Sequence, residues 1–247
     1  MRVDVQTEVG NNMRIVKVNS YEEMSVMAAE LLMKRVQQNP FLTVGLATGG
    51  TPKRMYEILV EKFRATGAPS YENVKTFNLD EYIGLPKTHE NSYYYYMNKH
   101  LFSGINVKKE NTNIPNGISN NHEEECQRYE RLIENAGGID LQILGIGKNG
   151  HIGFNEPGTS FTSKTHIVTL TSSTRKANER YFSSLNEVPT QAITMGIQTI
   201  MKSKEIILLA SGKSKSQAIE QLLKGNLTEQ FPASILNTHS NTTLLWT

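Results

Sequence analysis

The sequence predicts an α/β fold of a single domain, in which a mostly parallel, twisted sheet carries helices on both faces in a Rossmann-like arrangement. Short runs rich in β-branched residues alternate with amphipathic segments along the chain, which is the pattern of parallel strands joined by helices. The length of 247 residues fits one large domain with a substantial core. No internal repeat or linker interrupts the pattern.

The amino-terminal region sets the start of this domain. Residues 1–12 are polar and precede an apolar stretch that starts at Met13, so we expect them to form an extension outside a domain of residues 13–247. The first helix begins with a capping box made by Ser20 and Glu23. Its apolar side chains then recur every three or four residues, at Met24, Met27, Ala28, Leu31 and Leu32.

A strand at residues 42–47 leads through the turn Thr48-Gly-Gly-Thr-Pro52 into a second helix. We expect Thr51 to be its N-cap and Gly67 to end it. The other strands are expected at residues 74–79, 140–146, 167–170 and 205–210. The other helices are expected at residues 91–102, 122–136, 173–182, 189–201 and 213–224.

Composition and charge narrow the class of partner. Hydrophobic residues make up 38% of the chain and charged ones 20%, as in ordinary globular proteins. The formal net charge of +2 gives no electrostatic reason to expect nucleic acid or a membrane as partner. No run approaches the roughly 20 apolar residues of a membrane span, and the start does not resemble a secretory signal. We therefore expect a cytoplasmic protein, either a monomer or a homo-oligomer.

Metal and disulfide chemistry find no support in the sequence. The single cysteine, Cys126, excludes an internal disulfide and a cysteine-based zinc site. A packed, unreactive thiol is the simpler interpretation of this residue. No His-x-x-x-His, Cys-x-x-Cys or acidic metal cluster appears. We predict no metal and no cofactor.

The glycine turn after the expected strand at 42–47 is the first candidate binding site. A strand that ends in such a turn before a helix presents unpaired backbone N–H groups and the positive end of the helix dipole, which attract anions. We therefore predict that Thr48, Gly49, Gly50 and Thr51 bind a phosphate. A tight turn without a ligand is the alternative, and the Gly-Lys-Ser/Thr of a P-loop is missing.

A second glycine loop, Gly145-Ile-Gly-Lys-Asn-Gly150, formally matches the dinucleotide fingerprint G-x-G-x-x-G. That fingerprint needs a helix directly after the glycines, but the chain continues as His151-Ile-Gly-Phe-Asn-Glu-Pro-Gly158, which cannot form a regular helix. NAD is therefore not expected. The loop places His151, Asn155 and Glu156 at the carboxyl end of a strand, where parallel sheets bind ligands. His151 and Glu156 can form an oriented acid–base pair, with a surface histidine beside a structural glutamate as the alternative.

Four further charged side chains are candidates. Asp80 and Glu81 end another expected strand, and we expect one of the two carboxylates to point into a cleft at the same edge of the sheet. Arg175 and Lys213 lie near expected helix starts. They could complement a phosphate through a guanidinium fork and a point charge, respectively. Each of the four is otherwise an ordinary solvated charge.

Taken together, these segments resemble the glucosamine-6-phosphate deaminase (isomerase) family. The residues that carry the resemblance are Leu46-Ala-Thr-Gly-Gly-Thr-Pro52, Phe77-Asn-Leu-Asp-Glu-Tyr-Ile-Gly-Leu85 and Leu144-Gly-Ile-Gly-Lys-Asn-Gly-His-Ile-Gly-Phe-Asn-Glu-Pro-Gly158. Weaker similarity covers nearly all of the chain after Met13. The resemblance implies an enzyme of amino-sugar catabolism that converts glucosamine 6-phosphate to fructose 6-phosphate and ammonia. We would class it as a hydrolase acting on an amino sugar phosphate, because the C2 imine formed in the reaction is hydrolysed.

The resemblance also implies roles for individual residues. Asp80 would be the base that carries a proton between C2 and C1, and His151, held by Asn149 and Glu156, would open the sugar ring. Some members carry Asp where this chain has Asn149. An amide can orient an imidazole but cannot stabilise an imidazolium by charge, so we expect a weaker base at His151. The phosphate would lie against the turn at residues 48–51, Arg175 and Lys213.

Two rival functions share part of this evidence. A 6-phosphogluconolactonase would have the same expected fold, but those relatives carry a Leu-Phe-Pro-Gly type ending after the Gly-His, where this chain has Phe154-Asn-Glu-Pro-Gly158. A sugar-phosphate-sensing domain of a transcription regulator would need a helix-turn-helix segment, for which the twelve residues before the expected fold are too few. Both are therefore weaker interpretations than the deaminase.

Overall fold

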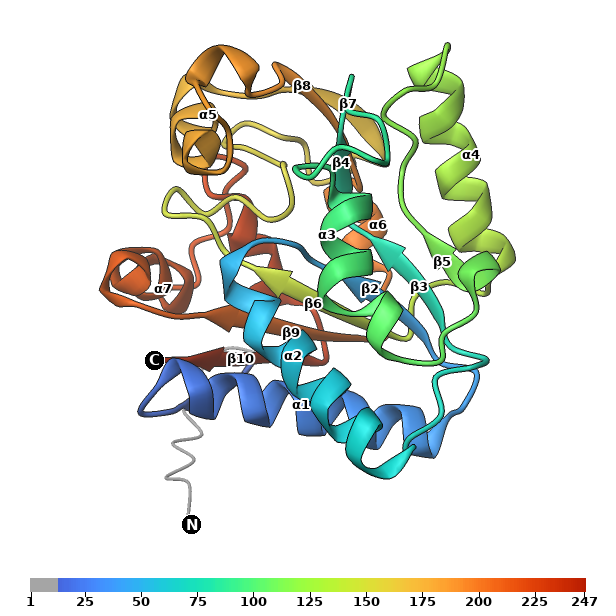
Figure 1. Ribbon diagram of the computed structural model, residues 1–247. Coiled ribbons are helices and arrows are strands. Elements are labelled where there is room, and N and C mark those ends of the chain that lie inside the picture. The colour runs from blue at the N-terminus through green and yellow to red at the C-terminus, as the bar shows by residue number, and fades with distance from the viewer. Residues whose placement is uncertain (1–12) are drawn as a thin grey trace.

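The computed structural model describes residues 13–247; the extension expected at residues 1–12 lies outside the described residues. The main sheet has the strand order β1-β10-β9-β6-β2-β3-β5 (Figure 1), and each neighbouring pair in it is parallel. This confirms the predicted parallel α/β fold. The strands are β1 (Met13–Lys17), β2 (Thr43–Leu46), β3 (Lys75–Asn78), β5 (Thr112–Asn113), β6 (Leu141–Gly145), β9 (Glu205–Ala210) and β10 (Thr242–Trp246).

Helices cover both faces of this sheet. Alternate side chains of β9 point to opposite faces, so Ile207 and Leu209 join one hydrophobic core while Ile206 and Leu208 join another. The first core contains side chains of α1 (Tyr21–Gln38), α2 (Gly50–Thr66) and α3 (Tyr93–His100). The second contains side chains of α4 (His122–Asn135), α6 (Ile197–Met201) and α7 (Ser216–Leu223). Two covered faces explain why the central strands are buried and mostly apolar.

The caps of the first two helices differ in detail from the sequence prediction. Ser20 is the N-cap of α1 as predicted, and its hydroxyl accepts a hydrogen bond from the Glu23 amide. The Glu23 carboxylate accepts from the amide of Asn19 instead of completing the box at Ser20. The N-cap of α2 is Gly49 with φ of 93°, so the prediction of Thr51 was wrong. Gly67 ends α2 with φ of 68°, as expected.

The prediction of a helix at residues 189–201 was wrong over its first half. Residues Gln191–Thr194 form strand β8, and only Ile197–Met201 are helical. β8 pairs antiparallel with β4 (Asp80–Tyr82) and with β7 (His166–Thr169), giving a separate three-stranded sheet. Tertiary pairing has overridden local helix pattern here. The strand expected at 167–170 therefore exists, but outside the main sheet.

The remaining differences are strands that were not predicted and shifted element ends. β1, β5 and β10 were not predicted, and β10 fills the sheet between β1 and β9. The helix expected at 173–182 is α5 (Ser172–Asn178) followed by a 3₁₀ turn at Glu179–Tyr181. The segment expected as one helix at 213–224 is a 3₁₀ turn at Lys213–Lys215 followed by α7. No helix among residues 13–247 is long and apolar enough to cross a membrane.

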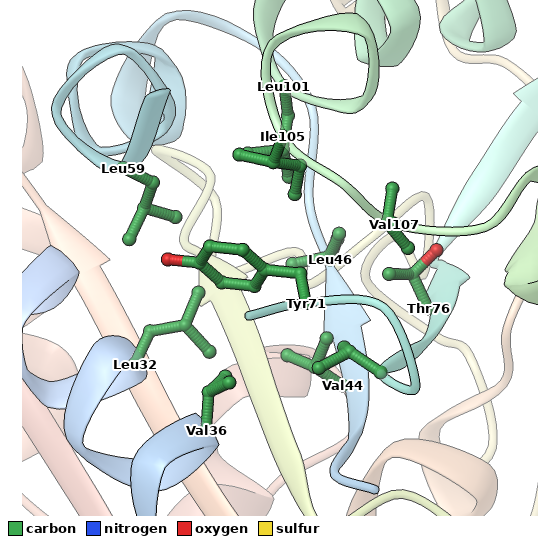
Figure 2. A pocket seen from close by; sticks show the side chains of 11 residues that line it. Leu32, Val36, Val44, Leu46, Leu59, Tyr71, Thr76, Leu101, Ile105 and Val107 are labelled. Carbon is green, nitrogen blue, oxygen red and sulfur yellow. The ribbon is translucent and has the colours of Figure 1, made fainter. Parts of the chain in front are cut away.

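A small cavity lies in the core beneath α1 and α2. Its volume is about 20 Å³, and it is lined mostly by aliphatic side chains. Tyr71 reaches into this space, with its hydroxyl between Leu32 and Leu59 (Figure 2), and that hydroxyl is buried without a hydrogen-bond partner. None of the residues predicted to bind substrate lines it.

Candidate active site

Asp80 lies at the junction of the two sheets. It follows β3 by two residues and begins β4, where it pairs with Thr194 of β8. The residue is 7% exposed, and no hydrogen bond joins its carboxylate to another described residue. Burial, and then the negative charge of Glu81, raise the pKa of Asp80 to about 8. A buried carboxyl group without a partner is costly for folding alone, which is typical of a functional group.

The neighbouring Glu81 is committed to a structural role. Its carboxylate accepts hydrogen bonds of 2.9 Å from the backbone amides of Tyr82, Tyr93 and Tyr94, and so holds the amino-terminal end of α3. Burial raises the pKa of Glu81, and the three N–H donors oppose that shift. Of the two adjacent acids, Asp80 is therefore the one whose carboxylate is available to a ligand.

Asn149, His151 and Glu156 form a connected relay in the irregular loop after β6. The Asn149 amide Nδ2 donates to Glu156 Oε2 over 2.7 Å, and Asn149 Oδ1 lies 2.7 Å from His151 Nδ1. Glu156 Oε2 itself lies 3.7 Å from His151 Nδ1. The loop thus brings together the three side chains that the family resemblance implies for ring opening. No helix follows its glycines, so the dinucleotide fingerprint lacks its structural partner.

The relay fixes the tautomer of the imidazole. A carboxylate only accepts hydrogen bonds, so the NH₂ group of Asn149 must face Glu156 and its Oδ1 must face His151. Oδ1 also only accepts, so His151 Nδ1 carries the proton and Nε2 keeps its lone pair. Burial lowers the pKa of His151, while the charge of Glu156 raises it and that of Lys215 lowers it. A neutral imidazole with a free Nε2 is a competent general base near neutral pH.

Packing places this relay loop against Asp80. A Cβ atom added to Gly153 would lie 3.4 Å from Asp80 Oδ2 and 3.0 Å from Thr194 Oγ1. The amide of Phe154 donates to the same Thr194 hydroxyl over 3.1 Å. Thr194 therefore joins the loop to the strand that pairs with Asp80. Sequence reasoning missed this residue, because it placed the segment in a helix.

Gly147 makes room for the imidazole. A Cβ atom at this position would lie 2.2 Å from both Cε1 and Nδ1 of His151, far inside van der Waals contact. Its backbone has no positive φ, so the requirement is close approach of the ring and not an unusual conformation. This explains one glycine of the G-x-G-x-x-G match without any nucleotide.

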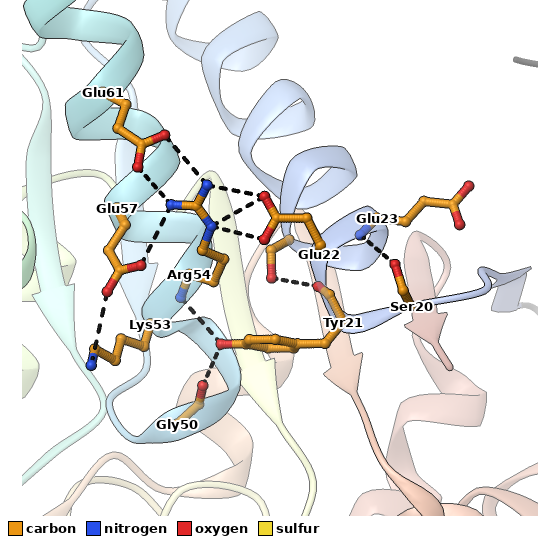
Figure 3. Close-up of polar contacts among 10 residues, drawn as sticks. Ser20, Tyr21, Glu22, Glu23, Gly50, Lys53, Arg54, Glu57 and Glu61 are labelled. Atoms are coloured by element: carbon orange, nitrogen blue, oxygen red, sulfur yellow. Dashed lines mark hydrogen bonds and ion pairs between the residues drawn. The ribbon is translucent and has the colours of Figure 1, made fainter.

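The glycine turn has the form of an anion site. No described residue accepts a hydrogen bond from the backbone N–H groups of Thr48, Gly49, Gly50 and Thr51. The turn's carbonyl groups instead face the protein: the Tyr96 hydroxyl donates to Gly49 O and the Tyr21 hydroxyl to Gly50 O, each over 2.6 Å. Figure 3 shows Tyr21 reaching from α1 to the start of α2. Unpaired amides at the start of a 17-residue helix attract a phosphate group.

The charges around Arg54 hold α1 and α2 together near this turn. Arg54 forms ion pairs with Glu22 of α1 over 2.8 Å and with Glu61 of its own helix over 2.6 Å (Figure 3). Its backbone amide also donates to the Tyr21 hydroxyl over 3.2 Å. The carboxylates thus occupy the guanidinium, and its role is to join α1 to α2.

The two predicted cations take different positions from Lys215, which was not predicted. The Arg175 guanidinium donates to the carbonyls of Leu185 and Val188, and Lys213 is exposed. Lys215 instead turns inward and donates to Ile146 O over 2.6 Å, at the start of the relay loop.

Two further positive charges lie near Lys215. Burial, Lys148 and Arg180 all lower the pKa of Lys215, so these three cations share one region. That region is next to His151, on whose pKa Lys215 acts. Three neighbouring cations repel one another unless an anion lies among them. Within residues 13–247, no group of three His, Cys, Asp or Glu side chains could hold a metal ion.

Comparison with known proteins places the chain in a family. The model for glucosamine-6-phosphate isomerases and 6-phosphogluconolactonases matches residues 19–246. The chain belongs to this family. Glucosamine-6-phosphate deaminases of Halalkalibacterium halodurans and Shouchella clausii are 57% and 58% identical to it, each over 94% of both chains.

Two solved structures differ in how closely they resemble this chain. A monomeric glucosamine-6-phosphate deaminase superimposes with a TM-score of 0.92 at 50% identity, covering 94% of this chain and 96% of the other. A 6-phosphogluconolactonase from Thermotoga maritima has a TM-score of 0.75 at 22% identity, over 95% of this chain and 99% of the other. The second likeness is one of fold alone.

Proposed function

We propose that this protein is a glucosamine-6-phosphate deaminase, which isomerises glucosamine 6-phosphate and releases ammonia to leave fructose 6-phosphate. Similarity to deaminases at 50–58% identity over almost the whole chain supports this substrate. The structural observation that carries the proposal is the buried, unpartnered carboxyl group of Asp80 beside the loop of the Asn149–His151–Glu156 relay.

Ring opening is the task of His151. Its Nε2 lone pair takes the proton from the C1 hydroxyl of the cyclic sugar, and the imidazolium then gives a proton to the ring oxygen. While the imidazole of His151 is protonated, its Nδ1–H donates to Asn149 Oδ1, and the Glu156 carboxylate stabilises the positive charge from 3.7 Å. The Asn149 amide is neutral and cannot stabilise the imidazolium by charge, so the electrostatic stabilisation comes from Glu156 through space.

Isomerisation and deamination are the task of Asp80. Its carboxylate takes the proton from C2 of the open-chain amino aldehyde and delivers it to C1. O1 gains a proton and the amino nitrogen loses one, which leaves a hydroxymethyl group at C1 and an imine at C2. Water then hydrolyses the imine and ammonia departs, so we class the enzyme as a hydrolase. Burial makes the carboxylate a stronger base than a solvated aspartate, because it raises the pKa of Asp80 to about 8.

The phosphate group anchors the substrate at a distance from the reacting carbons. We propose that the free amides of Thr48, Gly49, Gly50 and Thr51 bind it, as the sequence analysis predicts. Arg175 and Lys213 were the predicted cationic partners, but the inward position of Lys215 favours Lys215, together with Arg180, in this role. Binding energy from this handle positions C1 and C2 against the two catalytic side chains.

The decisive experiment is coupled detection of ammonia and fructose 6-phosphate from glucosamine 6-phosphate with the purified protein. The proposal requires both products in equal amounts, and their formation should disappear in Asp80→Asn. Hydrolysis of 6-phosphogluconolactone without ammonia release from the amino sugar would contradict it. The cytoplasmic location expected from the sequence stays a prediction, as does the choice between monomer and homo-oligomer.

A further inference from the structure

Thr174 connects α5 to the catalytic relay. It lies in the first turn of α5 and is 8% exposed, and its hydroxyl donates a hydrogen bond to Glu156 Oε1. Glu156 Oε2 is occupied by Asn149 on the other side. The carboxylate is therefore held between a donor from α5 and a donor from its own loop.

The Thr174 hydroxyl is not needed to cap its helix. Thr171 is the N-cap of α5, and its hydroxyl accepts the hydrogen bond from the Thr174 backbone amide over 3.2 Å. The Thr171 hydroxyl also lies 3.0 Å from Thr174 Oγ1, to which it donates. Thr174 Oγ1 can thus accept from Thr171 and donate to Glu156. The single proton of the Thr174 hydroxyl therefore goes to Glu156, which points to a role in the relay.

Rotation of the Glu156 carboxylate would disorder everything beyond it. Asn149 presents Oδ1 to His151 only while its NH₂ group faces Glu156 Oε2. If that oxygen turned away, the Asn149 amide could present either its oxygen or its NH₂ group to His151. The tautomer of His151 with a free Nε2 would then no longer be enforced.

We propose that Thr174 is a positioning residue for ring opening: its hydroxyl fixes the Glu156 carboxylate, which orients Asn149 and through it His151. This inference rests on the proposed function of the relay. Thr174 touches none of the reacting atoms, so it acts through Glu156 alone. The charged groups that face His151 are Glu156 of its own loop and Lys215 of the turn before α7.

The test is Thr174→Val, which keeps the branched shape and removes the hydroxyl, with Thr174→Ser as the variant that restores the hydroxyl. We expect Val to lower kcat about 10- to 100-fold, the usual effect of losing an outer hydrogen-bond partner of a catalytic group. KM should change less than about twofold, because the phosphate site is untouched. Ser should recover kcat to within about threefold of the wild type.

A second readout follows His151 directly. In Thr174→Val the Glu156 carboxylate is no longer held toward the relay, so its raising effect on the His151 pKa weakens and that pKa falls. NMR titration of the imidazole nitrogens, with His151→Gln to assign the resonance, should show this shift together with loss of a single tautomer. The measurement does not depend on turnover.

Thr199→Val is the matched control. Thr199 of α6 is 4% exposed, and its hydroxyl donates to Glu130 Oε1 of α4 over 2.6 Å, which is a comparable threonine–carboxylate contact outside the relay. It should lose stability like Thr174→Val but keep the wild-type kcat and His151 titration. Unchanged kcat and titration in Thr174→Val, or an equal kcat loss in Thr199→Val, would overturn the inference. Absence of ammonia from the wild type would instead overturn the proposed function.

Discussion

Replacing Asp80 with Asn should separate catalysis from stability. The variant keeps the size of the side chain and removes the proton carrier, so kcat should fall at least ~10²-fold, the lower scale for loss of a general base. Binding of a phosphorylated substrate analogue should be nearly unchanged, because the glycine turn and Lys215 are intact. At the same time the folded protein should become more stable at alkaline pH.

The size of the stability gain follows from the pKa of Asp80. Burial raises that pKa from 3.8 to about 8. The contribution of Asp80 to the stability of the wild-type protein is therefore fully present below about pH 4 and is lost as the pH rises through 8. The loss approaches 1.4 kcal/mol per pH unit below the folded pKa, or about 2–3 kcal/mol between pH 6 and pH 9. Asparagine does not titrate, so the advantage of the variant grows by this amount.

Urea unfolding of both proteins at pH 6 and pH 9 measures the difference. The wild-type kcat/KM should also rise with pH toward about 8, because only the ionised carboxylate takes the C2 proton. An advantage of Asp80→Asn that stays constant between the two pH values would refute the argument, since Asp80 would then ionise as an ordinary exposed acid. Full activity in the variant would move the base to another residue.

Three further predictions concern the phosphate site, the imidazole and the core. Lys215→Gln should raise KM about 5- to 150-fold, equivalent to ~1–3 kcal/mol for a charge-assisted contact, whereas Lys213→Gln should change KM less than about twofold. Steady-state kinetics measure both values, and a larger effect of Lys213→Gln would show that Lys213 is the phosphate ligand. Gly147→Ala should lower kcat at least ~10-fold by displacing the His151 ring, with little change in KM; normal turnover would show that the ring has space elsewhere. Tyr71→Phe should leave stability equal or raise it by up to ~1 kcal/mol in urea, because its buried hydroxyl has no partner; a loss above ~1 kcal/mol would indicate a water bound in the cavity.

Much of the fold and of the composition of the candidate relay could be predicted from the sequence. Parallel strands covered on both faces leave long apolar runs, so β2, β6 and β9 were found within a residue or two. Asp80 and His151 stood out because acids and a histidine follow such strands on irregular backbone. The reason is physical: the carboxyl edge of a parallel sheet gathers those residues from distant parts of the chain.

What the sequence could not predict depends on long-range pairing and on side-chain direction. β8 is held as a strand by β4 and β7, and its own residues fit a short helix equally well. Lys213 and Lys215 are indistinguishable by composition, and only the 3₁₀ turn decides which one points inward. The Thr174 contact spans a helix and a loop that are 18 residues apart, so no local pattern marks it.

Asn149 connects the orientation of His151 with the charge of Glu156. An ionised aspartate at this position would place a second negative charge 2.7 Å from Glu156 Oε2, where the Nδ2–H of Asn149 now donates. Two carboxylates at that distance repel strongly or share a proton, and a shared proton would remove the charge that stabilises the imidazolium. With asparagine, Glu156 accepts from neutral donors on both sides, Asn149 and Thr174, and has no second carboxylate beside it. The amide therefore costs His151 an adjacent charge but preserves the charge 3.7 Å away. In the proposed mechanism, the relay therefore takes its orientation from neutral hydrogen bonds and its electrostatic stabilisation from Glu156.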